Sequence, residues 1–126
     1  MNLMPLVDLL ATNQVGIKGE NLFINMLPPD SLNAILVRNT LAGTKIDYEL
    51  PKYFRTEFQL IVRGTDYTAT SNLIAQAVTA LTLVETQVEN QYFKYCRPST
   101  EPTSYPISKG DLIEFNVVFD VCMVES

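Results

Sequence analysis

The stretch that decides the fold is Asp111-Leu-Ile-Glu-Phe-Asn-Val-Val-Phe-Asp-Val-Cys-Met-Val124. Every second residue of its central part is large and apolar: Ile113, Phe115, Val117, Phe119, Val121 and Met123. The positions between them include the polar residues Glu114, Asn116 and Asp120. Because successive side chains of a strand point to opposite faces, this pattern predicts a long strand with one face against a core.

Two helical segments are expected to accompany this strand. The better one spans residues 66–82, is capped by Thr65 or Asp66, and carries an apolar stripe with helical spacing. The stripe consists of Thr70, Leu73, Ile74, Ala77, Val78 and Leu81. A shorter helix near the N-terminus carries Leu3, Leu6, Val7 and Leu10 on one side. It either covers the sheet or docks on a neighbouring subunit.

Further strands are predicted over residues 21–26, 33–39, 44–50, 56–63 and 87–96. Residues 40–43 are the right length to join two of them into a hairpin over 33–50. The Pro-rich stretch 97–106 is predicted to be a loop, either packed on its own sheet or extended toward a partner. We therefore expect a single α+β domain over residues 1–126, a mostly antiparallel sheet with an N-terminal helix and one central helix packed on one face.

The composition excludes several classes of protein. The 126 residues are 47% apolar and include 9 Lys and Arg against 14 Asp and Glu, a net charge of −5. This acidity argues against nucleic-acid binding and against binding to anionic membranes. We expect neither a signal peptide nor a membrane-spanning helix, since the chain opens without a basic region or a long apolar run. Cys96 and Cys122 are expected to be reduced, with a bridge between them as the alternative.

The sequence lacks the residues and motifs on which most enzymes rely. There is no histidine, which removes the commonest general base and metal ligand, and the five glycines form no phosphate-binding motif. Carboxylate pairs such as Asp47 with Glu49, or Glu114 with Asp120, are typical of a solvated strand face. We therefore expect no catalytic residue, no metal site and no cofactor, and a role in protein–protein assembly. A small enzyme that uses carboxylates, Tyr or Lys is the alternative.

Basic residues gather in one part of the chain. The candidate subunit or tube interface consists of Arg38, Lys45, Lys52, Tyr53, Arg55 and Arg63. Tyr and Arg are enriched at the centres of protein interfaces, and these cations would meet acidic residues of an adjacent copy. Ordinary surface charge is the alternative interpretation.

Two blocks carry a resemblance to a known family, Ala34-Ile-Leu-Val-Arg38 and Gly43-Thr-Lys-Ile-Asp-Tyr-Glu-Leu-Pro-Lys-Tyr-Phe-Arg-Thr-Glu-Phe-Gln-Leu-Ile-Val-Arg63. With the chain length and the order of predicted elements, they resemble the minor capsid or tail terminator (tail completion) proteins of long-tailed bacteriophages. The resemblance covers residues 3–124. It implies a tail-terminator-like fold without an active site.

The resemblance also implies partners and a location. Six copies would form a ring that caps the tail tube, stops its polymerisation and meets the head connector protein. DNA would pass through the channel without specific binding. The chain would be made in the cytoplasm of a bacterial host and end in the virion, at the tail or the head–tail interface, without contact with a membrane. A head-completion protein, either a connector stopper or an adaptor, and a monomeric protein-binding module are the alternatives.

Overall fold

The computed structural model describes residues 1–26, 32–40, 43–106 and 112–126, without the side chains of residues 105 and 106. Within these ranges the chain forms, in order, one helix, three strands, a second helix and four strands. They are α1 (Met4–Thr12), β1 (Leu22–Ile24), β2 (Ala34–Asn39), β3 (Tyr53–Gly64), α2 (Tyr67–Leu81), β4 (Leu83–Val88), β5 (Gln91–Pro98), β6 (Thr103–Pro106) and β7 (Ile113–Glu125).

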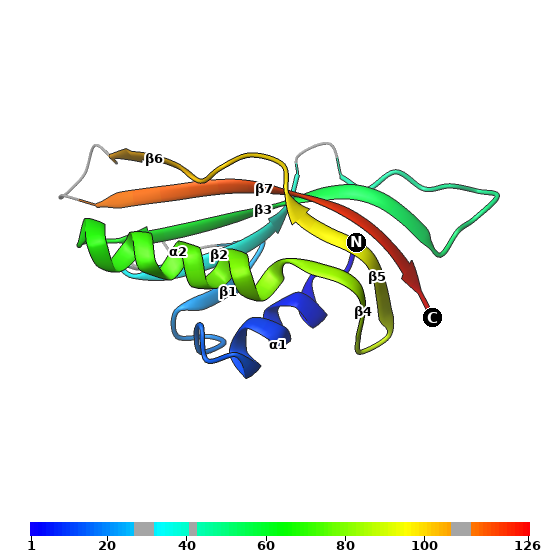
Figure 1. The fold of residues 1–126 in the computed structure, drawn as a ribbon, viewed down its shortest axis with the longest axis horizontal. Coiled ribbons are helices and arrows are strands. Elements are labelled where there is room, and N and C mark those ends of the chain that lie inside the picture. Colours follow the sequence, from blue (N-terminus) through cyan, green and yellow to red (C-terminus); the bar gives the residue numbers. More distant parts are fainter. Residues whose placement is uncertain (27–31, 41–42, 107–111) are drawn as a thin grey trace.

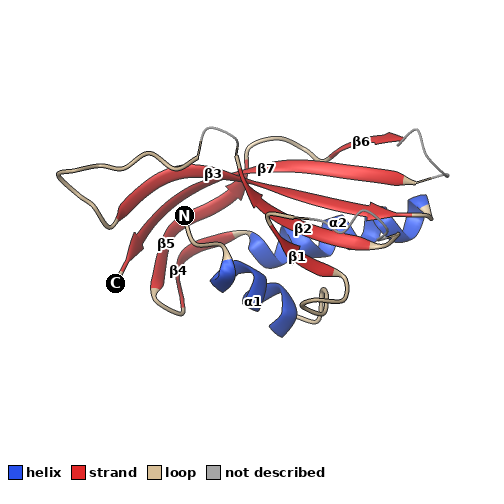
Figure 2. Cartoon of the chain, turned by 180° about the vertical axis from the view of Figure 1, so that it is seen from behind, coloured by secondary structure: helices blue, strands red, loops and turns tan. Residues whose placement is uncertain are grey.

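All seven described strands belong to one sheet, in the order β1-β2-β3-β7-β5-β4, with β6 also paired to β7. The β1–β2 pair is parallel and the other pairs are antiparallel. Both helices lie on the same face of the sheet (Figures 1 and 2). The predicted α+β fold, with a mostly antiparallel sheet and two helices on one face, is confirmed.

The centre of the sheet is the pair β3 and β7, which are in register from Tyr53 opposite Val124 to Gly64 opposite Ile113. Every second residue of each strand faces the helices, and from β7 this set includes the apolar residues that the sequence predicted. Phe58 and Phe119 are directly opposite each other, fully buried, with stacked rings 4.9 Å apart. This inward alternation places the core between the sheet and the helices.

The start of the helix α2 is defined by a cap at Asp66 and by its close approach to Gly64 of β3. The carboxylate of Asp66 accepts a hydrogen bond of 2.8 Å from the Ala69 backbone N–H, as an N-cap does. Gly64 ends β3 where a side chain would not fit, since a Cβ there would lie 2.1 Å from the Thr70 hydroxyl oxygen. Four members of the predicted stripe are buried and the other two pack half-buried against the core: Thr70, Ile74, Ala77 and Leu81, then Leu73 and Val78.

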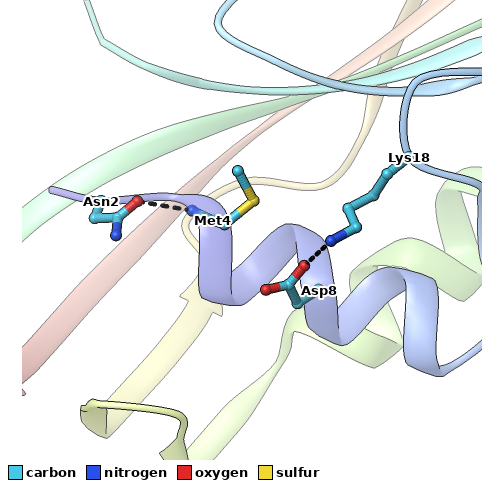
Figure 3. A network of polar contacts seen from close by, with 4 residues as sticks. All are labelled: Asn2, Met4, Asp8 and Lys18. Carbon is cyan, nitrogen blue, oxygen red and sulfur yellow. Dashed lines mark hydrogen bonds and ion pairs between the residues drawn. The ribbon is translucent and has the colours of Figure 1, made fainter.

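The helix α1 buries Leu6, Val7 and Leu10 and contacts α2, β1 and β4, so it covers the core as expected. Polar contacts are present at its start and at its middle (Figure 3). The Asn2 side chain accepts a hydrogen bond from the Met4 N–H, and Lys18 forms an ion pair with Asp8.

The predicted hairpin over residues 33–50 is wrong. Residues 43–50 form no strand, and β2 pairs instead with β3 and β1. These residues form a local turn instead of a strand. The Asp47 carboxylate accepts hydrogen bonds from the backbone N–H groups of Glu49 and Leu50. Such side chain–backbone bonds compete with sheet ladders.

Two other expectations need correction. The strand predicted over 87–96 is a hairpin of β4 and β5, which turn at Glu89, a residue with a left-handed φ of 53°. The end of the predicted loop 97–106 is the strand β6, which pairs with β7. The strand predicted from residue 111 begins at Ile113 among the described residues, and residue 111 lies outside them.

Cys96 and Cys122 are both free and buried. They belong to adjacent strands, but Cys96 is paired with Val121 and Cys122 with Tyr95, so their side chains point to opposite faces of the sheet. The alternative of a Cys96–Cys122 bridge is therefore excluded in this fold.

Candidate assembly surface

The face of the sheet turned away from the helices is called the outer face here, and it carries most of the candidate residues. On β3 it consists of Tyr53, Arg55, Glu57, Gln59, Ile61 and Arg63, which alternate with the residues that face the core. On β7 the residues opposite them are Val124, Cys122, Asp120, Val118, Asn116 and Glu114. The outer face is thus mainly polar, with charges of both signs.

Residues 43–52 form an excursion before β3 that extends beyond the sheet at one end of the molecule's long axis, and we call it the arm (Figure 1). Three of its apolar side chains are exposed: Ile46 at 63%, Tyr48 at 88% and Leu50 at 56%. The alternation that predicted a strand here is therefore real, but its apolar side has no partner among the described residues. Three exposed apolar residues in one short segment are typical of a contact surface.

Three adjoining hollows lie between the arm and the outer face, with volumes of about 400, 530 and 400 Å³. The first and second share Lys45 and Arg55, and the second and third share Glu49 and Tyr53. They therefore form one continuous depression, which we call the trough. Its other principal lining residues are Ile46, Tyr48, Leu50, Lys52, Glu57, Tyr95, Asp120 and Val124.

Tyr95 stands at the centre of the cationic part of the trough. The guanidinium of Arg97 lies 4.2 Å from the centre of the Tyr95 ring, a cation–π contact. A side-chain hydrogen bond with Tyr95 raises the pKa of Arg55, so this guanidinium stays charged at any physiological pH. Tyr95 thus contacts two cations, Arg97 over its ring and Arg55 through a side-chain hydrogen bond.

Tyr53 is held in place at the other end of the trough. Its hydroxyl lies 3.2 Å from the Cys122 Sγ, and this hydrogen bond is the main reason why the pKa of Tyr53 is raised. The phenol is therefore neutral at physiological pH, and Tyr53 lines the trough. The Lys52 carbonyl accepts a hydrogen bond from the Glu125 N–H, which ties the end of the arm to β7.

The structure brings four of the six predicted interface residues together, namely Lys45, Lys52, Tyr53 and Arg55, and places Arg38 and Arg63 elsewhere on the outer face. Arg38 donates to the Gln59 side chain at 2.6 Å, and Gln59 donates to Asn116 at 2.8 Å, so it belongs to a polar chain across three strands.

Arg63 lies eight residues from Arg55 along β3, which at the rise of a strand is about 26 Å. Its guanidinium pairs with the Glu114 carboxylate at 3.2 Å, and both side chains are largely buried. Arg63 therefore holds β3 to β7 and is far from the trough.

The charges in the trough are free to meet a partner. Within the described ranges, no ion pair involves Lys45, Lys52, Arg55, Glu57 or Asp120. Glu57 and Asp120 are directly opposite each other on β3 and β7, an arrangement of like charges that weakens a sheet unless other charges compensate.

Across the residues that the structure describes, no three His, Cys, Asp or Glu side chains gather as a metal ion would require. No described helix is long and apolar enough to cross a membrane. The trough offers aromatic rings, cations and carboxylates on an open surface, and this chemistry suits the binding of another polypeptide.

Sequence reasoning did not place Tyr95 beside Arg55 on this surface, and it assigned the alternating residues of the arm to a strand of the sheet. Tyr95 is 40 residues from Arg55 in sequence, and only the register of β3, β7 and β5 brings the two together through Cys122. For the arm, the alternation of Ile46, Tyr48 and Leu50 was visible in the sequence. It was interpreted as a strand, because an alternating segment is expected to pair within its own sheet.

Comparison with solved structures supports the fold. One chain, from a structure described as the virion of a native gene transfer agent (GTA) particle, superimposes with a TM-score of 0.60. It is 15% identical and covers 96% of this chain and 84% of its own length. A second solved structure, 16% identical, covers 94% of this chain and 89% of its own, but its TM-score of 0.45 is too low to support an argument.

No protein of curated function matches the sequence. A family model does match, and it covers residues 9–122, which is nearly the whole chain and includes the arm and most of the trough and of the β3–β7 pair. Its description is that of a bacteriophage tail terminator protein. The resemblance noticed in the sequence is confirmed, and the chain belongs to the bacteriophage tail terminator family.

Proposed function

We propose that this chain is the subunit of a ring, six copies in number, that caps the tail tube of a long-tailed phage and joins it to the head. Its partners are further copies of itself, the tail tube protein and the head connector protein. The family match over residues 9–122 supports a structural role in the phage tail. Ring formation, capping of the tube and contact with the head are the steps that we add.

The exposed apolar side chains of the arm are the observation that best supports the proposal. A ring needs head-to-tail contacts in which two different surfaces of one chain are complementary. Ile46, Tyr48 and Leu50 are too exposed to contribute to the fold of their own chain. Their burial against another chain at about 25 cal/mol per Å² is a driving force for assembly.

The charge of the chain is suited to a channel through which DNA passes. With a net charge of −5, a ring of six copies repels the phosphate backbone overall. Passage without specific binding follows if the lumen is neutral or acidic. A ring whose lumen is basic would contradict this part of the proposal.

The proposal places the chain in the virion after synthesis in the bacterial cytoplasm, and a tube-elongation assay tests it. Purified tube protein is allowed to polymerise with and without the chain, and tube lengths are measured by electron microscopy. We expect added chain to stop elongation and to leave tubes that bind heads. Unchanged elongation, with no chain sedimenting with the tubes, would overturn the proposal.

A further inference from the structure

The strand β3 has an open edge along its first residues. β2 pairs with β3 only from Phe58 onward, so residues 53–57 have a neighbouring strand on the β7 side alone. The Lys52 carbonyl accepts a hydrogen bond from β7, and successive residues of a strand turn their backbone groups to alternate sides. Arg55 and Glu57 therefore direct their N–H and C=O groups to the vacant side, where no backbone partner is found in the part of the chain that the structure describes.

A hollow of about 400 Å³ lies beside this open edge. Its lining includes Arg55, Thr56 and Glu57 of β3, together with Gly43 and Lys45 at the base of the arm. The arm therefore stands clear of the edge, although its residues alternate as those of a strand do. A segment with strand alternation and an open strand edge lie side by side, and each is a template for pairing with another chain.

The turn between the arm and β3 explains why the arm does not pair with this edge in its own chain. The Tyr53 N–H donates to the Leu50 carbonyl at 3.0 Å, which makes Pro51 and Lys52 the central residues of a two-residue turn. The turns that keep two strands together need a positive φ, whereas proline fixes φ at about −65° and the φ of Lys52 is negative. Turns of the other types splay the strands that they connect.

The same turn also sets a register that joins the wrong sides of the two segments. A hairpin continued from this turn would place Tyr48 opposite Arg55, and Ile46 opposite Glu57. The apolar side of the arm would then lie among the charges of the outer face. A slip by one residue exchanges the two sides of a strand, but within one chain the turn determines the register.

The arm of another copy is not bound to that register. Shifted by one residue, an antiparallel arm places Lys45 opposite Glu57. Asp47 then lies opposite Arg55, so both cross-strand pairs join opposite charges on the outer face, which favours the pairing. The added lysine also compensates the like charges of Glu57 and Asp120, which face each other on β3 and β7.

The shifted register turns the apolar side of the arm toward the core. Tyr48 lies opposite Phe54, which packs half-buried against the core, and Ile46 lies opposite Thr56. Removal of these exposed apolar side chains from water drives the contact. The pairing opens the local turn of the arm, and backbone hydrogen bonds to the edge of β3 replace the two that this turn loses.

We propose that the arm of one copy adds to the sheet of the next copy as an antiparallel strand on the open edge of β3, with Lys45 opposite Glu57 and Tyr48 against Phe54. Each copy contributes its arm to one neighbour and binds the arm of the other, which is the head-to-tail contact that a ring needs. This inference rests on the proposed ring, and it names the two surfaces that meet at each subunit contact.

Disulfide trapping between two variants, each with one added cysteine, tests the contact. Ile46→Cys in one chain and Thr56→Cys in the other should form a disulfide under mild oxidation, because the Cα atoms of such a facing pair are about 4.5 Å apart. The oligomer is formed from equal amounts of the two chains, in solution or on tail tubes, and mass spectrometry of the digest identifies the linked peptides. The matched control combines Ile46→Cys with Glu57→Cys, the pair that faces in the register of a closed hairpin, and we expect no disulfide between these two chains.

Charge reversal gives an independent measurement. Lys45→Glu and Glu57→Lys should each raise the concentration needed for assembly about tenfold, because each places like charges opposite one another across the contact. Mixed in equal amounts, the two variants should assemble as the original chain does, since copies that alternate around the ring then pair opposite charges at every contact. Lys45 and Glu57 are both exposed, and circular dichroism checks that each variant is folded.

The outcomes separate this inference from the proposed function. If rings form without a disulfide between positions 46 and 56, and both charge reversals assemble as the original chain does, the strand contact is wrong and the ring stands. A disulfide between positions 46 and 57 within one chain that carries both cysteines would show that the arm closes on its own edge, and it would also overturn the contact. If no oligomer forms in solution or on tail tubes, the proposed function fails, and the strand contact fails with it.

Discussion

Replacing Tyr48 by alanine is expected to weaken assembly of the chain without changing the stability of its fold. The side chain is 88% exposed in the arm, so its loss should change the free energy of unfolding by no more than about 0.5 kcal/mol. At a subunit contact, truncation of a buried tyrosine costs about 2 kcal/mol, which raises the dissociation constant of that contact about 30-fold. We therefore expect a folded chain of unchanged stability that assembles only at much higher concentration.

Light scattering coupled to size exclusion over a concentration series measures the assembly of Tyr48→Ala, and urea denaturation measures its stability. The matched control is Ile17→Ala, which removes a side chain that is 58% exposed in the segment between α1 and β1 and does not line the trough. We expect the control to assemble as the original chain does. Assembly of Tyr48→Ala at the original concentration, or a loss of stability above about 1 kcal/mol, would refute the reasoning.

Three further predictions concern the fold and are measured by urea denaturation. Phe119→Ala removes a fully buried ring stacked on Phe58 and should cost about 3–5 kcal/mol, so a loss below about 2 kcal/mol would contradict the described core. Asp66→Ala should cost about 1 kcal/mol because the Ala69 N–H loses its cap, whereas Asp66→Asn, which keeps a capping oxygen, should cost less. Burial raises the pKa of the Cys96 thiol well above its usual range, so the folded chain keeps a proton that the unfolded chain releases, and stability falls as pH rises above about 8.5. Cys96→Ala should make this fall shallower, and an equal slope in both chains would refute the assignment.

The centre of the fold was predictable from sequence because its elements are long and periodic. The alternation that ends at Met123 and the stripe that includes Ile74 each repeat over several periods, which leaves one consistent assignment. The strands β4 and β6 were missed because they lie beside these elements without a buried apolar side of their own. On β4 only Val88 is buried, and β6 is Thr-Ser-Tyr-Pro.

The arm shows why an alternating apolar pattern does not determine which strands pair with each other. Ile46, Tyr48 and Leu50 alternate as well as any strand of the chain, but β2 finds a better partner in β3, whose Leu60 and Val62 meet its buried residues. Long-range competition of this kind is invisible in a local window.

The candidate site was predictable in part, for a related reason. Lys45, Lys52, Tyr53 and Arg55 are close in sequence and stay close in space. Arg63 belongs to the same strand but is carried away from them by the rise of about 3.3 Å per residue. Which residues of a strand share a site depends on where the neighbouring segments end, and sequence spacing alone does not contain that information.

Electron microscopy of tail tubes incubated with the purified chain tests the central claim most directly. The account predicts a single ring of six copies at one end of each tube, with the arm of each copy at the contact to its neighbour, and no chain along the tube wall. The chain binding along the wall, or staying monomeric in solution and off the tubes at every concentration, would contradict it.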